Sequence, residues 1–185
     1  MMNILAIGAH PDDIEFGCGG TLIRYAQKKN NIYLLILTSG EVGGDPGRRR
    51  CEQEKAARLM KVKKTYWGDF RDTDIPRDRS VIMAIERVIR QTRPQMVLFN
   101  FLSDIHQDHR ALAHAALSAT RYTPEVLFYE VPTTQAFEPD VFVDISPVME
   151  KKIQLLKLHC SQVNRTRVQN LSILESARSC AIFRG

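Results

Sequence analysis

The sequence predicts a single-domain, three-layer α/β sandwich with a mostly parallel central sheet, and three observations support this prediction. Strand-like and helix-like segments alternate along the 185 residues. Several of the strand-like segments are nearly continuous in Val, Ile, Leu and Phe, as expected for strands covered on both faces. The chain shows no internal repeat or linker-like change in composition, and its length suits one domain (1–185) with one sizeable core.

The elements follow one another in a regular order. We expect strands at residues 3–9, 32–38, 65–68, 96–101, 126–131 and 141–145. We expect helices at residues 19–29, 48–61, 79–92, 109–121 and from 147 onward. Pro94 ends the third of these helices, because proline disfavours helical geometry in the residue before it. Alternating strands and helices give a parallel sheet of Rossmann-like character, with helices on both faces.

The bulk properties exclude several classes of protein. The composition, 44% hydrophobic and 25% charged, is that of an ordinary globular protein. No apolar run is long enough to span a bilayer and no basic leader precedes a cleavage site, so we expect a cytoplasmic protein. The four cysteines are scattered and form no C-x-x-C pair, which argues against a disulfide framework or a structural zinc site. The arginines at 48–50 belong to a mixed-charge helical stretch, so we expect no nucleic-acid partner.

Polar segments follow three of the predicted strands. HPDD begins at His10 directly after the first strand, SGEVGGDPG follows the second, and LSDIHQDHR follows the fourth. In a parallel sheet the carboxyl ends of the strands meet at one edge, where ligands bind. We therefore expect these three loops to converge on one functional site.

The glycines after HPDD raise the alternative of a phosphate-binding loop. GCGGT does not match G-x-G-x-x-G, and it is not a P-loop because no G-K-[ST] follows. Gly17, Gly19 and Gly20 are better explained by a tight turn that starts the next helix close to the sheet. The motif therefore favours a metal site over dinucleotide binding.

The histidines and aspartates of two loops have the spacing that a metal site needs. His10 and Asp13 are three residues apart, and so are His106 and His109, so one turn can direct each pair to one ion. Two histidines and one carboxylate, with a position open for water, form a common catalytic zinc site. A metal ion would also offset the repulsion between Asp12 and Asp13. The other two histidines fall in predicted helices away from this edge, where we expect structural or exposed positions.

Together, AHPDDIEFGCGGTL and HQDHR resemble the LmbE-like, or PIG-L, family of zinc-dependent N-acetylglucosaminyl de-N-acetylases. The resemblance extends over almost the whole chain through TSGE, RRCEQEKAARLM, FRDTDIP, RPQMVLFN, FVDIS and EKKIQLLKLHCSQ. It implies a Rossmann-like α/β sandwich, in agreement with the alternation of strands and helices. It also implies an enzyme that removes acetate from an amino sugar.

The resemblance implies a role for each residue of the two motifs. His10, Asp13 and His109 become the ligands of one zinc ion per chain. Asp12 becomes the general base. His106 faces the developing oxyanion or the leaving amine, and a charged imidazole there would stabilise the oxyanion.

Three further residues carry roles that the resemblance implies. Asp108 pairs with a histidine and tunes it, whereas Arg49 and Asp72 match positions that contact substrate. The sequence ends at AIFRG, where the family commonly continues with an acidic, aromatic-rich strand. We therefore expect a C-terminal segment that is short for the family, with a pocket that is either reduced or completed by a second copy in a homo-oligomer.

The implied substrate is a small N-acetylglucosamine-type sugar or its conjugate. Two alternatives stay open at this stage. One is a metal-dependent hydrolase of another amide or ester, and the other is a sugar- or nucleotide-binding module without catalysis. The binding module has no need of Asp12, because binding requires no base, whereas the hydrolases depend on it.

Overall fold

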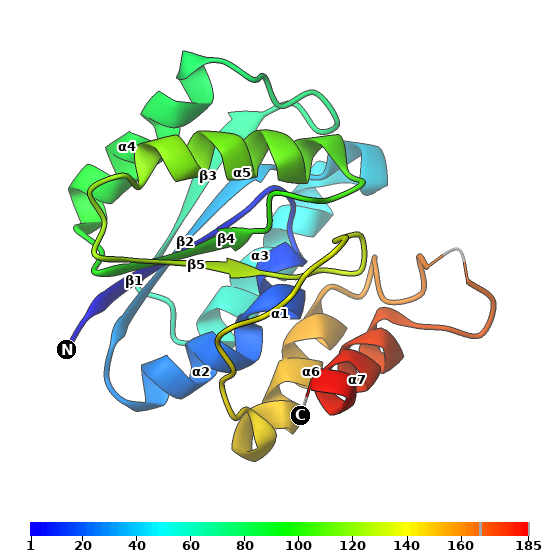
Figure 1. The fold of residues 1–185 in the computed structure, drawn as a ribbon. Helices are drawn as coiled ribbons and strands as arrows, with labels where there is room; N and C mark the ends of the chain where they lie inside the picture. The colour runs from blue at the N-terminus through cyan, green and yellow to red at the C-terminus, as the bar shows by residue number, and fades with distance from the viewer. Residues whose placement is uncertain (167, 185) are drawn as a thin grey trace.

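A five-stranded parallel sheet lies between two layers of helices in this computed structural model, which describes residues 1–166 and 168–184 (Figure 1). The strands are β1 (Asn3–Gly8), β2 (Asn31–Thr38), β3 (Lys64–Phe70), β4 (Met96–Asn100) and β5 (Glu125–Tyr129). Their order is β3-β2-β1-β4-β5, and every pairing between these strands is parallel. The predicted three-layer α/β fold is therefore confirmed. The winding direction reverses between β1 and β4, and ligands bind at such switch points in α/β sheets.

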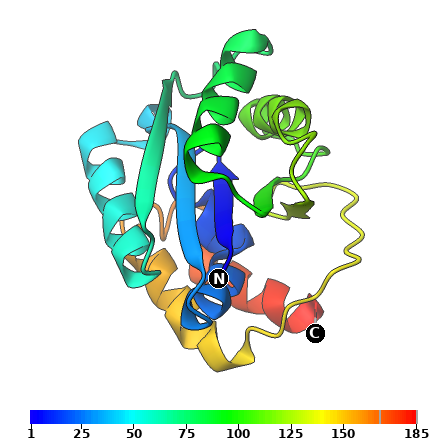
Figure 2. The ribbon, with the colours of Figure 1, turned by 90° about the vertical axis from the view of Figure 1, so that its left-hand side faces the viewer.

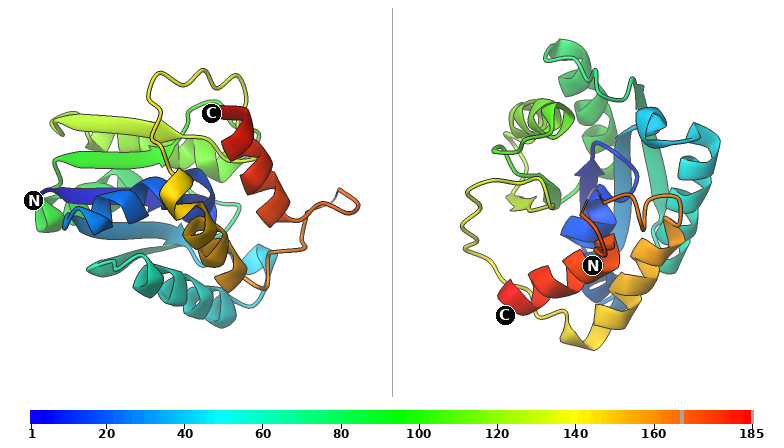
Figure 3. Two further views of the ribbon diagram at one scale, coloured as in Figure 1. Left: turned by 90° about the horizontal axis from the view of Figure 1, so that it is seen from below. Right: turned by 90° about the vertical axis from the view of Figure 1, so that its right-hand side faces the viewer.

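The helices divide between the two faces of the sheet, as Figures 1 and 2 show. One face is covered by α1 (Asp13–Gly17), α2 (Gly19–Gln27), α3 (Pro46–Leu59), α6 (Met149–Leu158) and α7 (Ile173–Arg184). The other face is covered by α4 (Arg79–Thr92) and α5 (Gln107–Ala119). Helices α6 and α7 lie side by side beneath the sheet (Figure 3). Among the helices of the described residues, none has the length and apolarity needed to cross a membrane.

Two apolar cores explain why the central strands are almost continuously hydrophobic. Successive side chains of a strand point to opposite faces, so Ile4 packs into the core under α1, α2 and α6, and Leu5 packs into the core under α4 and α5. Leu34 and Leu35 of β2 divide in the same way. Both faces are covered, so polar residues have no solvent-facing position along β1 or most of β2.

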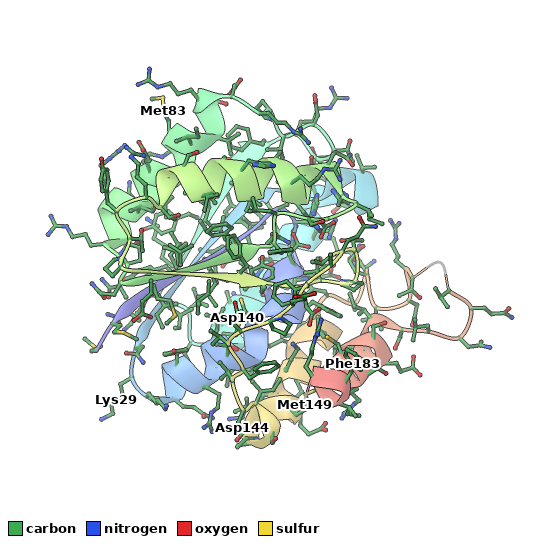
Figure 4. All side chains as sticks on the ribbon, viewed as in Figure 1. Lys29, Met83, Asp140, Asp144, Met149 and Phe183 are labelled. Atoms are coloured by element: carbon green, nitrogen blue, oxygen red, sulfur yellow. The ribbon has the colours of Figure 1, made fainter. Side chains whose placement is uncertain are left out.

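The sixth predicted strand, at 141–145, is wrong. This segment forms no ladder with β5, and it runs outside the sheet between Asp140 and Asp144, which are labelled in Figure 4. Val141 and Phe142 are 59% and 64% exposed, so neither face of the segment is buried. The β-branched and aromatic residues of VFVDI favour an extended backbone, but a strand also needs a neighbouring backbone with which to exchange hydrogen bonds.

The close approach of α1 to β5 depends on Gly17. A Cβ atom at this position would lie 2.1 Å from Cδ2 of Tyr129, whose hydroxyl oxygen lies 2.8 Å from the Ile7 carbonyl oxygen and 3.1 Å from Oδ1 of Asn100. The Tyr129 ring is therefore fixed and cannot move aside cheaply. We expect Gly17→Ala to lower the free energy of unfolding by about 1–3 kcal/mol, as measured by urea denaturation.

Gly47→Ala provides the matched control in α3. The nearest atom to a Cβ there is Asp45 Oδ1 at 3.4 Å, an ordinary contact. Alanine also has the higher helix propensity, so this variant should be as stable as the parent protein or more stable. Equal unfolding midpoints for both variants would show that α1 tolerates displacement from β5.

Candidate active site

The candidate site lies at the carboxyl edge of the sheet, on the right-hand side of Figure 1. His10 follows β1, and His106 forms the N-cap of α5 after β4. β1 and β4 are adjacent, so the fold brings together two motifs that lie almost a hundred residues apart. The loops after β2 and β3 close the same edge through Gly40 and Asp72.

Three histidines cluster at the centre of this edge. One ring nitrogen from each of His10, His106 and His109 lies within 4.8 Å of the others. The ring centroids of His10 and His109 are 4.7 Å from that of His106 and 5.3 Å from each other. His10 and His109 are buried, and His106 is half-buried.

Asp13 bridges two of these histidines. Its Oδ1 lies 3.2 Å from Nε2 of His109, and its Oδ2 lies 3.5 Å from Nδ1 of His10. Oδ2 also accepts hydrogen bonds from the backbone N–H groups of Ala9 and His10, which fix the carboxylate in place. Nε2 of His109 is buried and has no hydrogen-bond partner within the described part of the chain. An unpartnered imidazole nitrogen beside a carboxylate and a second histidine fits a zinc ion.

Further carboxylates hold the outer nitrogens of the two buried histidines. Nε2 of His10 lies 3.0 Å from Asp72 and 3.1 Å from Asp108, and Nδ1 of His109 lies 3.1 Å from Asp104. Carboxylates in such positions orient metal-binding histidines and set their tautomers. Asp108 was expected to pair with a histidine, and in the structure its partner is His10.

The electrostatics of the cluster favour positive charge. Burial alone would lower the pKa of His10, but hydrogen bonds to Asp108 and two other aspartates raise it well above its usual value. Burial opposes charge on His109 as well, yet Asp13 and its other carboxylate neighbour raise the pKa of His109 to about 9. The pKa of Asp13 falls well below its usual range, because the two histidines outweigh its burial. The carboxylates that raise these pKa values would also attract a metal cation, whose binding would displace the protons of the histidines.

Asp12 stands apart from the three histidines and Asp13. It forms the N-cap of α1 with φ 99°, a left-handed conformation that costs a residue other than glycine about 1–3 kcal/mol. Its carboxylate lies 3.5 Å from Nη2 of Arg49 and is 17% exposed. Burial raises the pKa of Asp12 to about 6, although Arg49 opposes this effect. Asp12 is thus an accessible carboxylate that is mostly ionised at neutral pH.

His106 differs from the charged imidazole that the sequence suggested. Its Nδ1 accepts a hydrogen bond from the backbone N–H of Asp108, so the proton of the neutral ring resides on Nε2. Burial lowers the pKa of His106, and the charges of His10 and His109 lower it further. The structure therefore favours a neutral histidine with one N–H available as a donor.

Arg49 and Asp72 line the site but are engaged by protein groups. Arg49 is 5% exposed and donates hydrogen bonds to the carbonyl oxygens of Gly40 and Pro11. Asp72 is 4% exposed and accepts a hydrogen bond from the N–H of Val42 in addition to its contact with His10. Their role as substrate contacts stays a prediction.

Asp104 was not among the site residues expected from the sequence, whereas His159 was expected at a structural or exposed position. Asp104 lies in the same polar loop as His109, and its place at a strand exit was a usable signal. His159 is 1% exposed and lies 3.6 Å from the buried carboxylate of Glu15, so its position is structural. No local sequence pattern connects His159 with Glu15, because α6 contacts α1 only through tertiary packing. His114 is exposed, as expected.

Comparison with known proteins agrees with the motif-based resemblance. Residues 5–120 match the family model described as PIG-L: GlcNAc-PI de-N-acetylase. "Uncharacterized deacetylase YaiS" of Escherichia coli K12 is 37% identical over 167 residues, which cover 85% of this chain and 90% of that protein. Diacetylchitobiose deacetylase of Thermococcus kodakarensis is 34% identical over 185 aligned residues, which cover 86% of this chain and 69% of that protein.

A solved structure supports the same assignment. The structure of N,N'-diacetylchitobiose deacetylase from Pyrococcus horikoshii, in complex with its inhibitor MPG, superposes with a TM-score of 0.85 at 26% identity. The match covers 100% of this chain and 78% of that one. The family that the motifs suggested is thus confirmed: the chain belongs to the PIG-L family of de-N-acetylases, and its enzyme class is that of a deacetylase.

Proposed function

We propose that this protein removes the N-acetyl group from a small N-acetylglucosamine-type sugar or its conjugate, with a zinc ion held by His10, Asp13 and His109. The main support is the separation of two kinds of aspartate in one cluster. Asp13 lies between two buried histidines, whereas Asp12 lies beside Arg49 with an accessible carboxylate. The description of the family model and the diacetylchitobiose deacetylases among the relatives support the sugar class.

The chain's own residues can move the protons that amide hydrolysis requires. The zinc ion, when bound, would supply a Lewis acid that polarises the acetyl carbonyl and acidifies water. Asp12 accepts a proton from the attacking water as the oxygen bonds to the carbonyl carbon. Asp12 then gives this proton to the amine as the C–N bond breaks, which yields acetate and the free amino sugar. A pKa of about 6 suits both steps, because a base that titrates near the working pH can accept and return a proton.

His106 would stabilise the oxyanion as a neutral donor. Its Nδ1 is occupied by the N–H of Asp108, so Nε2–H is the group free to donate. A single donor to an oxyanion commonly contributes about 3 kcal/mol to transition-state stabilisation. Loss of this donor should reduce turnover without removing the metal.

A substrate screen with metal control tests the proposal. The purified protein is incubated with N-acetylglucosamine, N,N'-diacetylchitobiose and N-acetylglucosamine conjugates, and acetate and free amine are both measured. We expect release that a chelator abolishes and added zinc restores. Failure of the zinc-loaded protein to release acetate from any of these compounds would reject the proposal. Cleavage of simple amides or esters alone would favour the alternative hydrolase.

Asp104→Asn should weaken zinc binding by about 10- to 100-fold. The Asp104 carboxylate lies 3.1 Å from Nδ1 of His109, so it favours a proton on Nδ1, and Nε2 would then be free to bind the ion. Asparagine preserves the shape but weakens this preference for one tautomer. Competition with a fluorescent zinc chelator measures the affinity, and Asp140→Asn, at an exposed carboxylate, is the control. Equal affinities for both variants would show that Asp104 does not orient His109.

A further inference from the structure

A buried polar cluster lies behind the candidate site and takes no part in the chemistry described above. It consists of Glu15 from α1, Gln53 from α3 and His159 at the C-terminal end of α6. Their side chains are almost inaccessible, with residue exposures of 0%, 0% and 1%. Burial of a carboxylate and an imidazole costs free energy unless they compensate each other, so their retention needs an explanation.

The three side chains form a chain of contacts. Gln53 donates a hydrogen bond through Nε2 to Oε1 of Glu15 at 2.7 Å. The other oxygen of Glu15, Oε2, lies 3.6 Å from Nε2 of His159. Neither this oxygen nor either ring nitrogen of His159 has a hydrogen-bond partner within residues 1–166 and 168–184. The ion pair is therefore the main compensation for the buried carboxylate.

The charge on His159 agrees with this pairing. Burial alone would lower the pKa of His159, but Glu15 outweighs burial and raises it. The raised pKa favours a proton on the imidazole beside this carboxyl group. His159 therefore lies against one oxygen of Glu15 while the other oxygen accepts the hydrogen bond from Gln53.

The cluster ends at the backbone of Asp12. With Nε2 of Gln53 committed to Glu15, Oε1 of Gln53 faces the N–H of Asp12 at 3.4 Å. Arg49, one turn earlier on α3, holds the carbonyl oxygen of Pro11 at 2.8 Å. Helix α3 therefore binds both polar atoms of the Pro11–Asp12 peptide group, the carbonyl oxygen and the N–H. The φ of 99° at Asp12 needs such support.

We propose that Glu15, Gln53 and His159 are positioning residues that hold Asp12 in its left-handed conformation and thereby direct its carboxylate. The inference rests on the proposed role of Asp12 as the base. None of the three touches the metal ligands' side chains through a hydrogen bond in the described chain, so each acts through Asp12. The network thereby connects the C-terminal end of α6 to the position of Asp12.

Two single variants break the network at different links. His159→Phe preserves the size of the ring but leaves Glu15 as an uncompensated buried carboxylate. Gln53→Met preserves length and removes the acceptor for the Asp12 N–H without changing any charge. We expect each to lower kcat for the acetylated sugar about 10- to 100-fold, with KM and zinc content unchanged, because small misplacement of a catalytic group has effects of this size.

A double variant separates positioning from packing. In Glu15→Gln combined with His159→Phe, the buried charge is gone and the new amide oxygen can still accept from Nε2 of Gln53. We expect the double variant to recover most of the kcat that His159→Phe loses. His114→Phe, at an exposed histidine of α5, is the control and should behave like the parent protein. No recovery in the double variant would overturn the inference, because the loss would then follow from ring packing.

Crystal structures of the variants give a readout that does not depend on activity. In Gln53→Met we expect Asp12 to leave its left-handed conformation. Retention of that conformation together with parental kcat in both single variants would overturn the inference. If the parent protein releases no acetate from any sugar, the proposed function fails. The backbone conformation of Asp12 in the Gln53→Met structure then still tests whether the network positions Asp12. If His159→Phe does not fold, Gln53→Met carries the test, because it leaves the ion pair intact.

Discussion

Asp12→Asn should reduce kcat for deacetylation by about 10²- to 10⁴-fold while zinc content stays at the parental level. An amide has nearly the size of a carboxylate but cannot accept the proton of the attacking water. The side chain of Asp12 contacts Arg49 at 3.5 Å, whereas Asp13 contacts both buried histidines, so the proposed metal ligands should remain in place. Steady-state kinetics on a verified substrate, with zinc measured on the same sample, gives both quantities.

The pH profile adds a second criterion for Asp12. Its pKa is raised to about 6 by burial, so the carboxylate becomes protonated, and unable to act as a base, as pH falls through this value. The positive charge of zinc would shift this loss to lower pH. The parent protein should therefore lose activity at about pH 6 or below, and the residual activity of Asp12→Asn should lack this step. Parental turnover in the variant would exclude Asp12 as the base, and loss of zinc would assign it to the metal site.

The fold was predictable where local pattern and tertiary structure agree. β1 and β2 are apolar on both faces because helices cover both, and this burial is visible directly in the sequence. The segment 141–145 has the same apolar character but no backbone partner, and pairing is a non-local property that a residue pattern does not encode. The failed strand and the correct ones thus differ in their neighbours and not in their composition.

The candidate site also has features that local motifs predict and features that depend on tertiary packing. HPDD and HQDH were predictable as one site because each follows a strand and the carboxyl ends of β1 and β4 are adjacent. The lowered pKa of His106 and the hydrogen bond that its Nδ1 accepts were not predictable, because they depend on burial and on the helix cap at the start of α5. The contact between Glu15 and His159 depends on the packing of α6 against α1, which no sequence motif predicts.

His109→Ala should abolish stoichiometric zinc binding and with it deacetylation. The variant removes the nitrogen that lies 3.2 Å from Asp13 and lacks a hydrogen-bond partner among the described residues. Zinc bound to the folded parent protein should raise the free energy of unfolding by about 2.7 kcal/mol at a hundredfold excess over Kd. We expect no such stabilisation in His109→Ala, as measured by thermal unfolding with and without zinc.

The variants His114→Ala and His106→Ala sharpen this prediction. His114 lies on the same helix but is exposed, so its loss should change neither zinc binding nor stabilisation by zinc. His106→Ala distinguishes two ligand sets, because its ring nitrogen lies within 4.8 Å of those of His10 and His109. If Asp13 completes the site, His106→Ala retains zinc and loses turnover. If His106→Ala loses zinc as His109→Ala does, the ion is held by three histidines, and Asp13 instead serves to orient them.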